Sequence, residues 1–209
     1  RDSIYIIFLM KADIIVIGGG HAGCEAAAAA ARIGVKTILI THKFETIGQM
    51  SCNPAIGGVG KSHLVKEIDA ADGIMARCAD RAAIHLKVLN SSKGPAVRAT
   101  RAQADRELYK KSVQKELKNL EHLEIVEGEV TDFGIQNNQI ASVTVGESKI
   151  LKAQKVILTT GTFLNGKLFT GMDNNEGGRV GDNSSKKLAE KLRNIDFSVG
   201  RLKTGTPPR

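Results

Sequence analysis

A glycine-rich segment near the N-terminus constrains the fold of this 209-residue sequence more than any other feature. Gly18, Gly20 and Gly23 have the spacing G-x-G-x-x-G, and a continuous apolar run over residues 12–17 comes directly before them. Such a run is typical of a strand buried on both faces of a parallel sheet. The first glycine permits a sharp bend, the second lets backbone amides approach a pyrophosphate, and the third allows close helix-strand packing. We therefore predict a dinucleotide-binding turn made of Gly18, Gly19, Gly20, His21, Ala22 and Gly23.

The residues after this turn continue the same supersecondary unit. Residues 24–33 are almost entirely alanine, the strongest helix former, and Gly34 supplies a stop signal. Residues 36–40 then have the pattern of a second buried strand, which predicts a right-handed parallel unit. The acidic residue that normally binds the adenosine ribose at the end of this strand is absent, and the nearest acid is Glu45. We therefore assign no ribose carboxylate.

The middle of the chain reads as a long loop followed by helices. Residues 41–60 are rich in Gly, Pro, Asn and Ser, and loops of this length inside compact domains tend to be functional. Helical patterns follow over residues 61–75, 80–90 and 103–120, with a basic loop over residues 91–101.

The C-terminal half predicts the rest of the sheet. Residues 123–127 form a third parallel-strand candidate, and residues 129–136 and 139–146 alternate around Asn137-Asn138, a pair that accepts a tight turn. This antiparallel meander continues over 149–152, and residues 155–159 read as another buried strand. A glycine-containing loop, a short helix over 185–193 and a strand over 197–202 complete the pattern.

Together these elements predict an α/β Rossmann-like FAD/NAD(P)-binding fold of the glutathione-reductase type, with a parallel sheet and an inserted antiparallel β-meander, truncated at its C-terminal end. The meander favours FAD, although a nicotinamide enzyme stays open. Residues 12–209 are expected to form an incomplete N-terminal FAD-binding domain. Residues 1–11 are expected to be leader or artificially added residues reaching the start of the strand. The apolar run over residues 4–10 is shorter than the roughly 20 residues that span a bilayer, so no membrane segment is predicted.

The three cysteines differ in their surroundings. Cys52 lies in the glycine-rich loop beside Asn53 and Pro54, so it is either a nucleophile or a small residue that fills a turn. Cys24 and Cys78 fall in or beside helices, where packing is the expected role. The cysteines are widely spaced and the histidines lack ligand spacing, so we predict no disulfide framework and no metal site. A reducing, cytoplasmic location fits this pattern.

Two further segments carry possible phosphate chemistry. Residues 57–62 resemble a triphosphate-binding loop, but Ala55 replaces its first glycine and no strand is expected before it, so we reject that interpretation. The formal net charge is +8, which favours a polyanionic partner such as nucleic acid. The basic loop and the following helix start supply candidate tRNA-binding or phosphate-binding residues, which are Lys93, Arg98, Arg101 and Arg106.

These segments together resemble the MnmG family, also called GidA, of tRNA uridine 5-carboxymethylaminomethyl modification enzymes. The matching strings are IGGGHAG at 17–23, GQMSCNPAIGG at 48–58, SKGPAVRATRAQADR at 92–106 and GRLKTGTPPR at 200–209. The resemblance implies an enzyme that, with a GTPase partner of the MnmE type, adds a carboxymethylaminomethyl or aminomethyl group to carbon 5 of the tRNA wobble uridine. It also implies a homodimer.

The same resemblance implies FAD as cofactor, with NADH and methylene-tetrahydrofolate used by the full-length enzyme. By position, residues 18–23 would hold the FAD pyrophosphate, with Val130 and Ser185 as further FAD contacts, and Cys52 would act on the uracil. Other functional parts of the family lie beyond Arg209, so this fragment alone is expected to be inactive. Three alternatives stay open: a folate-dependent tRNA uracil-5 methyltransferase, a non-catalytic basic RNA-binding module, and an NAD-dependent dehydrogenase.

Overall fold

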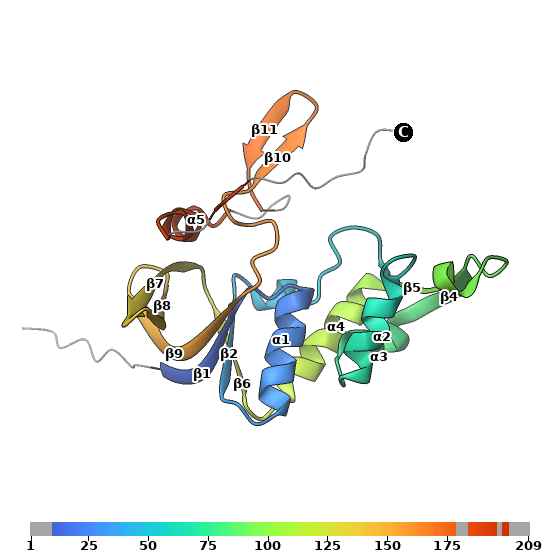
Figure 1. The fold of residues 1–209 in the computed structure, drawn as a ribbon, viewed down its shortest axis with the longest axis horizontal. Coiled ribbons are helices and arrows are strands. Elements are labelled where there is room, and N and C mark those ends of the chain that lie inside the picture. The colour runs from blue at the N-terminus through green and yellow to red at the C-terminus, as the bar shows by residue number, and fades with distance from the viewer. Residues whose placement is uncertain (1–9, 179–183, 196–197, 201–209) are drawn as a thin grey trace, which may run out of the picture. The chain divides into compact units, whose positions relative to one another are not determined.

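The computed structural model describes residues 10–178, 184–195 and 198–200. Contacts divide the chain after Gly161 into two compact units, and Figure 1 labels their helices and strands. Residues 1–9 lie outside the described residues, as do three of the six residues of the strand predicted over 197–202. The described residues 198–200 are not in a strand.

The parallel half of the larger sheet has the strand order β6 (Leu123–Glu127), β2 (Thr37–Thr41), β1 (Met10–Ile17) and β9 (Lys149–Leu158). β1 lies between β2 and β9 and runs parallel to both. All of β2 and the last three residues of β1, Ile15 to Ile17, are buried, which explains the apolar sequence there. β1 begins at Met10 rather than at residue 12, because Met10 and Lys11 already pair with β9.

The antiparallel half follows in the order β9, β8 (Gln139–Val145) and β7 (Val130–Gln136). Asn137 and Asn138 have φ values of 50° and 58°, the left-handed conformation that the predicted hairpin turn requires. β9 is one continuous strand that pairs with both β1 and β8, where the sequence indicated two separate strands. The predicted Rossmann-like α/β fold with a parallel sheet and an inserted antiparallel meander is confirmed.

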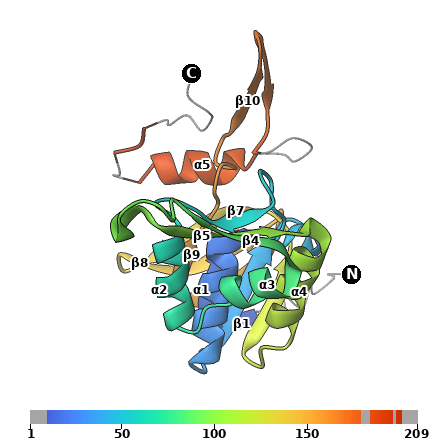
Figure 2. The same ribbon diagram turned by 90° about the vertical axis from the view of Figure 1, so that its right-hand side faces the viewer.

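Helices cover the parallel strands and share one apolar core. α1 (His21–Arg32) contacts β1, β2 and β9, and α4 (Arg106–Lys118) contacts α1 and α3 (Met75–Ala82), as Figures 1 and 2 show. The core joins alanines of α1 to larger side chains of the sheet and of α4, among them Val16, Leu39, Val113 and Leu117. Alanine at these α1 positions lets the helix approach the sheet closely.

The helix predicted over residues 80–90 is wrong. α3 ends at Ala82, and β4 (Ala83–Leu89) follows directly and pairs with β5 (Ala99–Ala104), which also pairs with β3 (Ala55–Gly57). All pairs in this three-stranded sheet are antiparallel. Ile84, Leu86 and Val88 alternate with polar residues, and the pairing with β5, which is distant in sequence, selects the strand. α2 (Ser62–Ala70) follows β3.

The second unit contains a hairpin and a helix. β10 (Lys167–Thr170) pairs antiparallel with β11 (Asp173–Glu176), in the segment where the sequence predicted only a loop. α5 (Lys186–Arg193) matches the predicted short helix, and Leu164 forms a β-bridge with Ser185 just before it. In the described part of the chain no helix is both long enough and apolar enough to cross a membrane.

Candidate functional site

The predicted dinucleotide turn lies at the carboxyl end of β1, where parallel sheets bind their ligands. The amide of Gly18 donates a hydrogen bond of 2.8 Å to the carbonyl oxygen of Ile40 in β2. On the other side, the Thr159 hydroxyl donates to the carbonyl oxygens of Ile17 at 2.9 Å and Gly18 at 3.1 Å. Both neighbouring strands therefore fix the path of the turn.

The glycines of the turn are required for different reasons. A Cβ atom at Gly18 would lie 2.4 Å from the Thr159 carbonyl oxygen, and one at Gly23 would lie 1.8 Å from the Gly18 carbonyl oxygen. A Cβ atom at Gly19 would lie 2.5 Å from the Thr41 hydroxyl oxygen. At Gly20, by contrast, a Cβ atom would meet nothing within 4 Å. The protein's own packing thus demands three of these glycines but not Gly20.

Gly20 is the N-cap of α1, and its backbone is extended. No side chain caps this helix end, and the first turn contains no acidic residue. Backbone amides and the positive end of the helix dipole therefore face the open space beside Gly20. A pyrophosphate fits this arrangement, because it can take the space that a side chain at Gly20 would fill.

The side chain of His21 packs within the protein rather than facing a ligand. Its ring stacks on Tyr109 of α4 with centroids 5.6 Å apart and an interplanar angle of 26°. Burial lowers the pKa of His21, which keeps the imidazole neutral. Its contribution to an anion site is therefore its backbone amide, as expected from its place in the turn, and the exposed Ala22 offers its amide in the same way.

Cys52 is exposed, and the structure shows why. Ile47 and Met50 are buried in the core shared with α1, and they anchor the loop just before Cys52. The Gln114 amide of α4 also holds this loop, through carbonyl oxygens of Phe44, Glu45 and Ile47 at 3.2–3.3 Å. The chain then rises to the surface at residues 51–53 before it enters β3. No sequence pattern indicated this role of Gln114.

Arg106 ties the Cys52 loop to the start of α4. Its guanidinium Nη2 donates a hydrogen bond of 2.6 Å to the carbonyl oxygen of Cys52. Two residues further along the loop, the carbonyl oxygen of Pro54 accepts a hydrogen bond of 2.8 Å from the Ala104 amide. Arg106, a candidate phosphate ligand from the sequence, thus binds the protein's own backbone.

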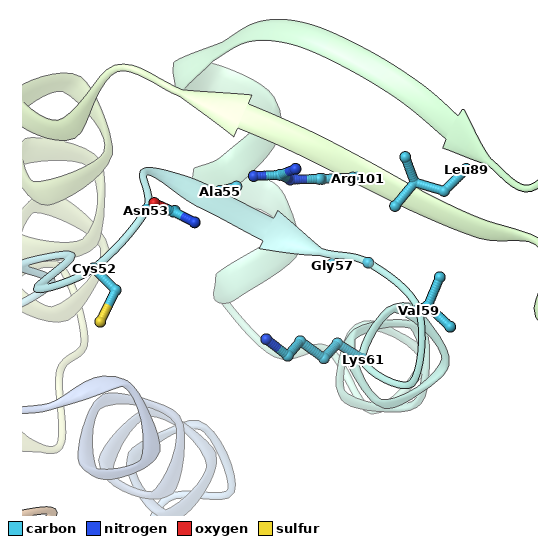
Figure 3. Close-up of a pocket in the computed structure, with 9 residues that line it drawn as sticks. Cys52, Asn53, Ala55, Gly57, Val59, Lys61, Leu89 and Arg101 are labelled. Atoms are coloured by element: carbon cyan, nitrogen blue, oxygen red, sulfur yellow. The ribbon is translucent and has the colours of Figure 1, made fainter. Parts of the chain in front are cut away.

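A pocket of about 390 Å³ opens beside Cys52. In Figure 3 the Lys61 side chain extends from the start of α2 toward Cys52, and the Arg101 guanidinium lies near the Asn53 end of β3. The lining combines the cysteine loop, the segment from β3 to α2, and the strands β4 and β5: Cys52, Asn53, Ala55, Gly57, Gly58, Val59, Lys61, Leu89 and Arg101.

The sequence matches the family described as Glucose inhibited division protein A over residues 13–209. The chain belongs to the GidA family. Its structure is similar to that of GidA from Aquifex aeolicus in two crystal forms, each with a TM-score of 0.90 and 47% sequence identity. Each of these similarities covers 94% of this chain and 33% of the Aquifex chain, so this chain spans about a third of that length.

More distant structures share the fold alone. The GidA-related protein from Thermus thermophilus is 20% identical with a TM-score of 0.66, over 90% of this chain and 69% of that one. PqsL from Pseudomonas aeruginosa, a probable FAD-dependent monooxygenase, is 14% identical with a TM-score of 0.51, over 70% of this chain and 41% of its own.

Within this GidA chain the predicted basic residues do not form one cluster. Arg101 lines the pocket and Arg106 holds the Cys52 loop, whereas Lys93 and Arg98 lie in the β4–β5 loop. There the Arg98 Nε donates a hydrogen bond of 3.1 Å to the carbonyl oxygen of Lys93. The structure therefore links two of the four residues to Cys52 and leaves the other two in a separate loop.

The two remaining predicted cofactor contacts lie in different units. Val130 begins β7 with its side chain buried, two residues after Gly128, whose amide donates a 2.8 Å hydrogen bond to the Thr41 carbonyl oxygen at the end of β2. A ligand contact at Val130 would therefore be made by its backbone. Ser185 precedes α5 in the second unit and is also buried.

The other two cysteines are buried, as expected. Burial raises the pKa of the Cys24 thiol to about 12 and also raises that of Cys78. Both thiols are therefore protonated and shielded at neutral pH, which leaves Cys52 as the exposed thiol of the described residues. Among the described residues no group of three or more His, Cys, Asp or Glu side chains is placed to hold a metal ion.

Proposed function

We propose that this chain is the FAD-binding part of an enzyme that adds a carboxymethylaminomethyl or aminomethyl group to carbon 5 of the tRNA wobble uridine. Membership of the GidA family supports the reaction class. The open space at Gly20, beside an uncapped helix end, carries the dinucleotide-binding part of the proposal.

In this proposal the turn residues 18–23 hold the FAD pyrophosphate through backbone amides. Val130 and Ser185 supply further FAD contacts. Bound FAD supplies redox chemistry at its flavin ring, with NADH as reductant and methylene-tetrahydrofolate as one-carbon donor in the full-length enzyme.

Cys52 is the proposed catalytic residue, which acts covalently on the uracil or assists its activation. Three features support this role: its exposure, the hydrogen bond from Arg106 to its carbonyl oxygen, and its place at the pocket rim. A thiol that merely filled a turn would need no such access to solvent.

The proposed partners are tRNA, an MnmE-type GTPase and a second copy of the same protein, in the cytoplasm. The net charge of +8 and the exposed basic residues of the β4–β5 loop support contact with a polyanion.

Flavin binding is tested with the variant Gly20→Val. The valine side chain enters open space, so we expect the fold to survive, as measured by circular dichroism, while the purified protein loses its visible flavin absorbance. Gly94→Val is the matched control, because Gly94 also has open space at its Cβ position and an ordinary φ of −60°. Retained flavin in Gly20→Val would contradict the proposed pyrophosphate site.

The reaction is tested by mass spectrometry of tRNA nucleosides from cells that lack the full-length gene and from cells where it is restored. We expect carboxymethylaminomethyl-type or aminomethyl-type wobble uridines to vanish and then return. Unchanged wobble uridines with missing 5-methyluridine would instead identify a uracil-5 methyltransferase. Restoration with Cys52→Ala should leave the wobble uridine unmodified, and normal modification would reduce Cys52 to a turn residue.

A further inference from the structure

The pocket beside Cys52 carries positive charge without a matching negative charge. Its charged lining residues are Lys61 and Arg101, and none of the described residues that line it carries a carboxylate. Within the described part of the chain, neither of them forms an ion pair with an acidic side chain. Arg101 is also half-buried in β5, where an unpaired guanidinium is costly. An anion in the pocket would offset this cost.

The pairing of the strands places a lysine on one side of Arg101 and a glycine on the other. In the three-stranded sheet Arg101 pairs with Gly57 of β3 on one side and with Lys87 of β4 on the other. Directly opposed residues project from the same face of a sheet, so Lys87 adds to the positive potential around Arg101. Gly57 leaves the other side of Arg101 free of a side chain.

The segment from β3 to α2 lines the pocket with two glycines, whose backbone no side chain of their own covers. A Cβ atom at Gly57 would lie 2.3 Å from the Thr100 carbonyl oxygen, so close packing demands glycine there. Gly58, with φ of +112°, also lines the pocket, and its Cβ position is open. As predicted, no strand precedes the position of the first glycine of a triphosphate loop: β3 begins at that position, which is Ala55. The segment therefore exposes its backbone beside Lys61 and does not form a triphosphate-binding loop.

We propose that this pocket is a phosphate subsite, in which Lys61 and Arg101 bind the phosphate of a uridine nucleotide whose base lies at the Cys52 thiol. Guanidinium groups bind phosphate through paired hydrogen bonds, and a lysine ammonium binds it as a point charge. The inference rests on the proposed function, because it assigns Cys52 a uracil-containing substrate. It adds Lys61 and Arg101 as residues that position that substrate.

The test measures how ligands protect Cys52 from alkylation by iodoacetamide. Cys52 is exposed whereas Cys24 and Cys78 are buried, so peptide mass spectrometry of the native protein reports on Cys52. Uridine 5′-monophosphate should slow the alkylation, and uridine without phosphate should not. A uridine trinucleotide distinguishes the source of the phosphate: protection at lower concentration indicates an RNA strand, and equal protection indicates a mononucleotide.

The variants Lys61→Gln and Arg101→Gln should each raise the half-protecting concentration of the monophosphate about tenfold, the loss of one charge-assisted contact. Lys61→Arg should restore protection, and Lys149→Gln, an exposed lysine of β9 outside the pocket lining, should leave it unchanged. Equal protection by uridine and its monophosphate, or unchanged protection in both glutamine variants, would overturn the phosphate subsite. Flavin content and wobble-uridine modification test the proposed function separately, so either idea can fail while the other stands.

Discussion

The glycine turn and the Cys52 pocket are built in contrasting ways. The turn is one run of six residues, 18–23, whose role is visible in the order of its amino acids. The pocket gathers the cysteine loop, the start of α2, Leu89 and Arg101 from separate parts of the chain. A short motif can therefore identify a backbone-built anion site, while a side-chain-built pocket depends on strand pairing between distant segments. Four predictions test this difference.

The largest expected effect concerns the cysteines. Cys52 should react with iodoacetamide in the native protein, whereas Cys24 and Cys78 should react at least about a thousandfold more slowly, because they are exposed only when the fold opens. Peptide mass spectrometry over a time course measures all three. Comparable rates for Cys24 and Cys52 would mean that α1 is not anchored in the core as described.

The next effect separates the glycines of the turn. Gly23→Ala places a Cβ atom 1.8 Å from a backbone oxygen and should lower the free energy of unfolding by about 3 kcal/mol or more. Gly20→Ala has open space and should change it by less than about 1 kcal/mol. Chemical denaturation measures both. Similar losses in the two variants would remove the distinction between packing glycines and a ligand-facing glycine.

A smaller effect is expected from the tether of the cysteine loop. Arg106→Gln removes the hydrogen bond to the Cys52 carbonyl oxygen and should speed hydrogen exchange at the nearby Ala104 amide about tenfold, with global stability nearly unchanged. Arg98→Gln is the control, because Arg98 bonds to its own loop. Equal exchange in both variants would show that the loop does not depend on Arg106.

The smallest effect is a pH dependence in the turn itself. Burial lowers the folded-state pKa of His21 below its ordinary value of 6.5, so the unfolded chain binds a proton more readily. The free energy of unfolding should therefore have its full value above pH 6.5 and should decrease as the pH falls below 6.5. Denaturation at several pH values compares the protein with His21→Gln, which should lose this component. An identical pH profile would show that His21 does not contribute it.

The sequence predicted the parallel strands best. The runs at residues 12–17 and 123–127 are short and bounded by polar residues or glycine, so their periodicity had one good interpretation, and Asn137-Asn138 marked the hairpin. The segment 83–89 directly follows a real helix, and so short an apolar-rich segment is ambiguous between helix and strand, which is why a helix is predicted there. Only its pairing with β5 decided for a strand. The β10–β11 hairpin had no strong apolar signal, since all four residues of β11 are polar.

Sequence alone therefore determined the Rossmann-like unit, because its glycines, alanines and buried strands interact with close neighbours along the chain. It also marked Cys52 as unusual. It did not indicate which residues surround the Cys52 thiol. Tertiary structure decided that Arg106 binds the Cys52 backbone, that Gln114 holds the preceding loop, and that Arg101 shares a pocket with Lys61. The physical reason is that these contacts join segments separated by 40 to 70 residues, and local patterns do not encode which distant strands and helices meet.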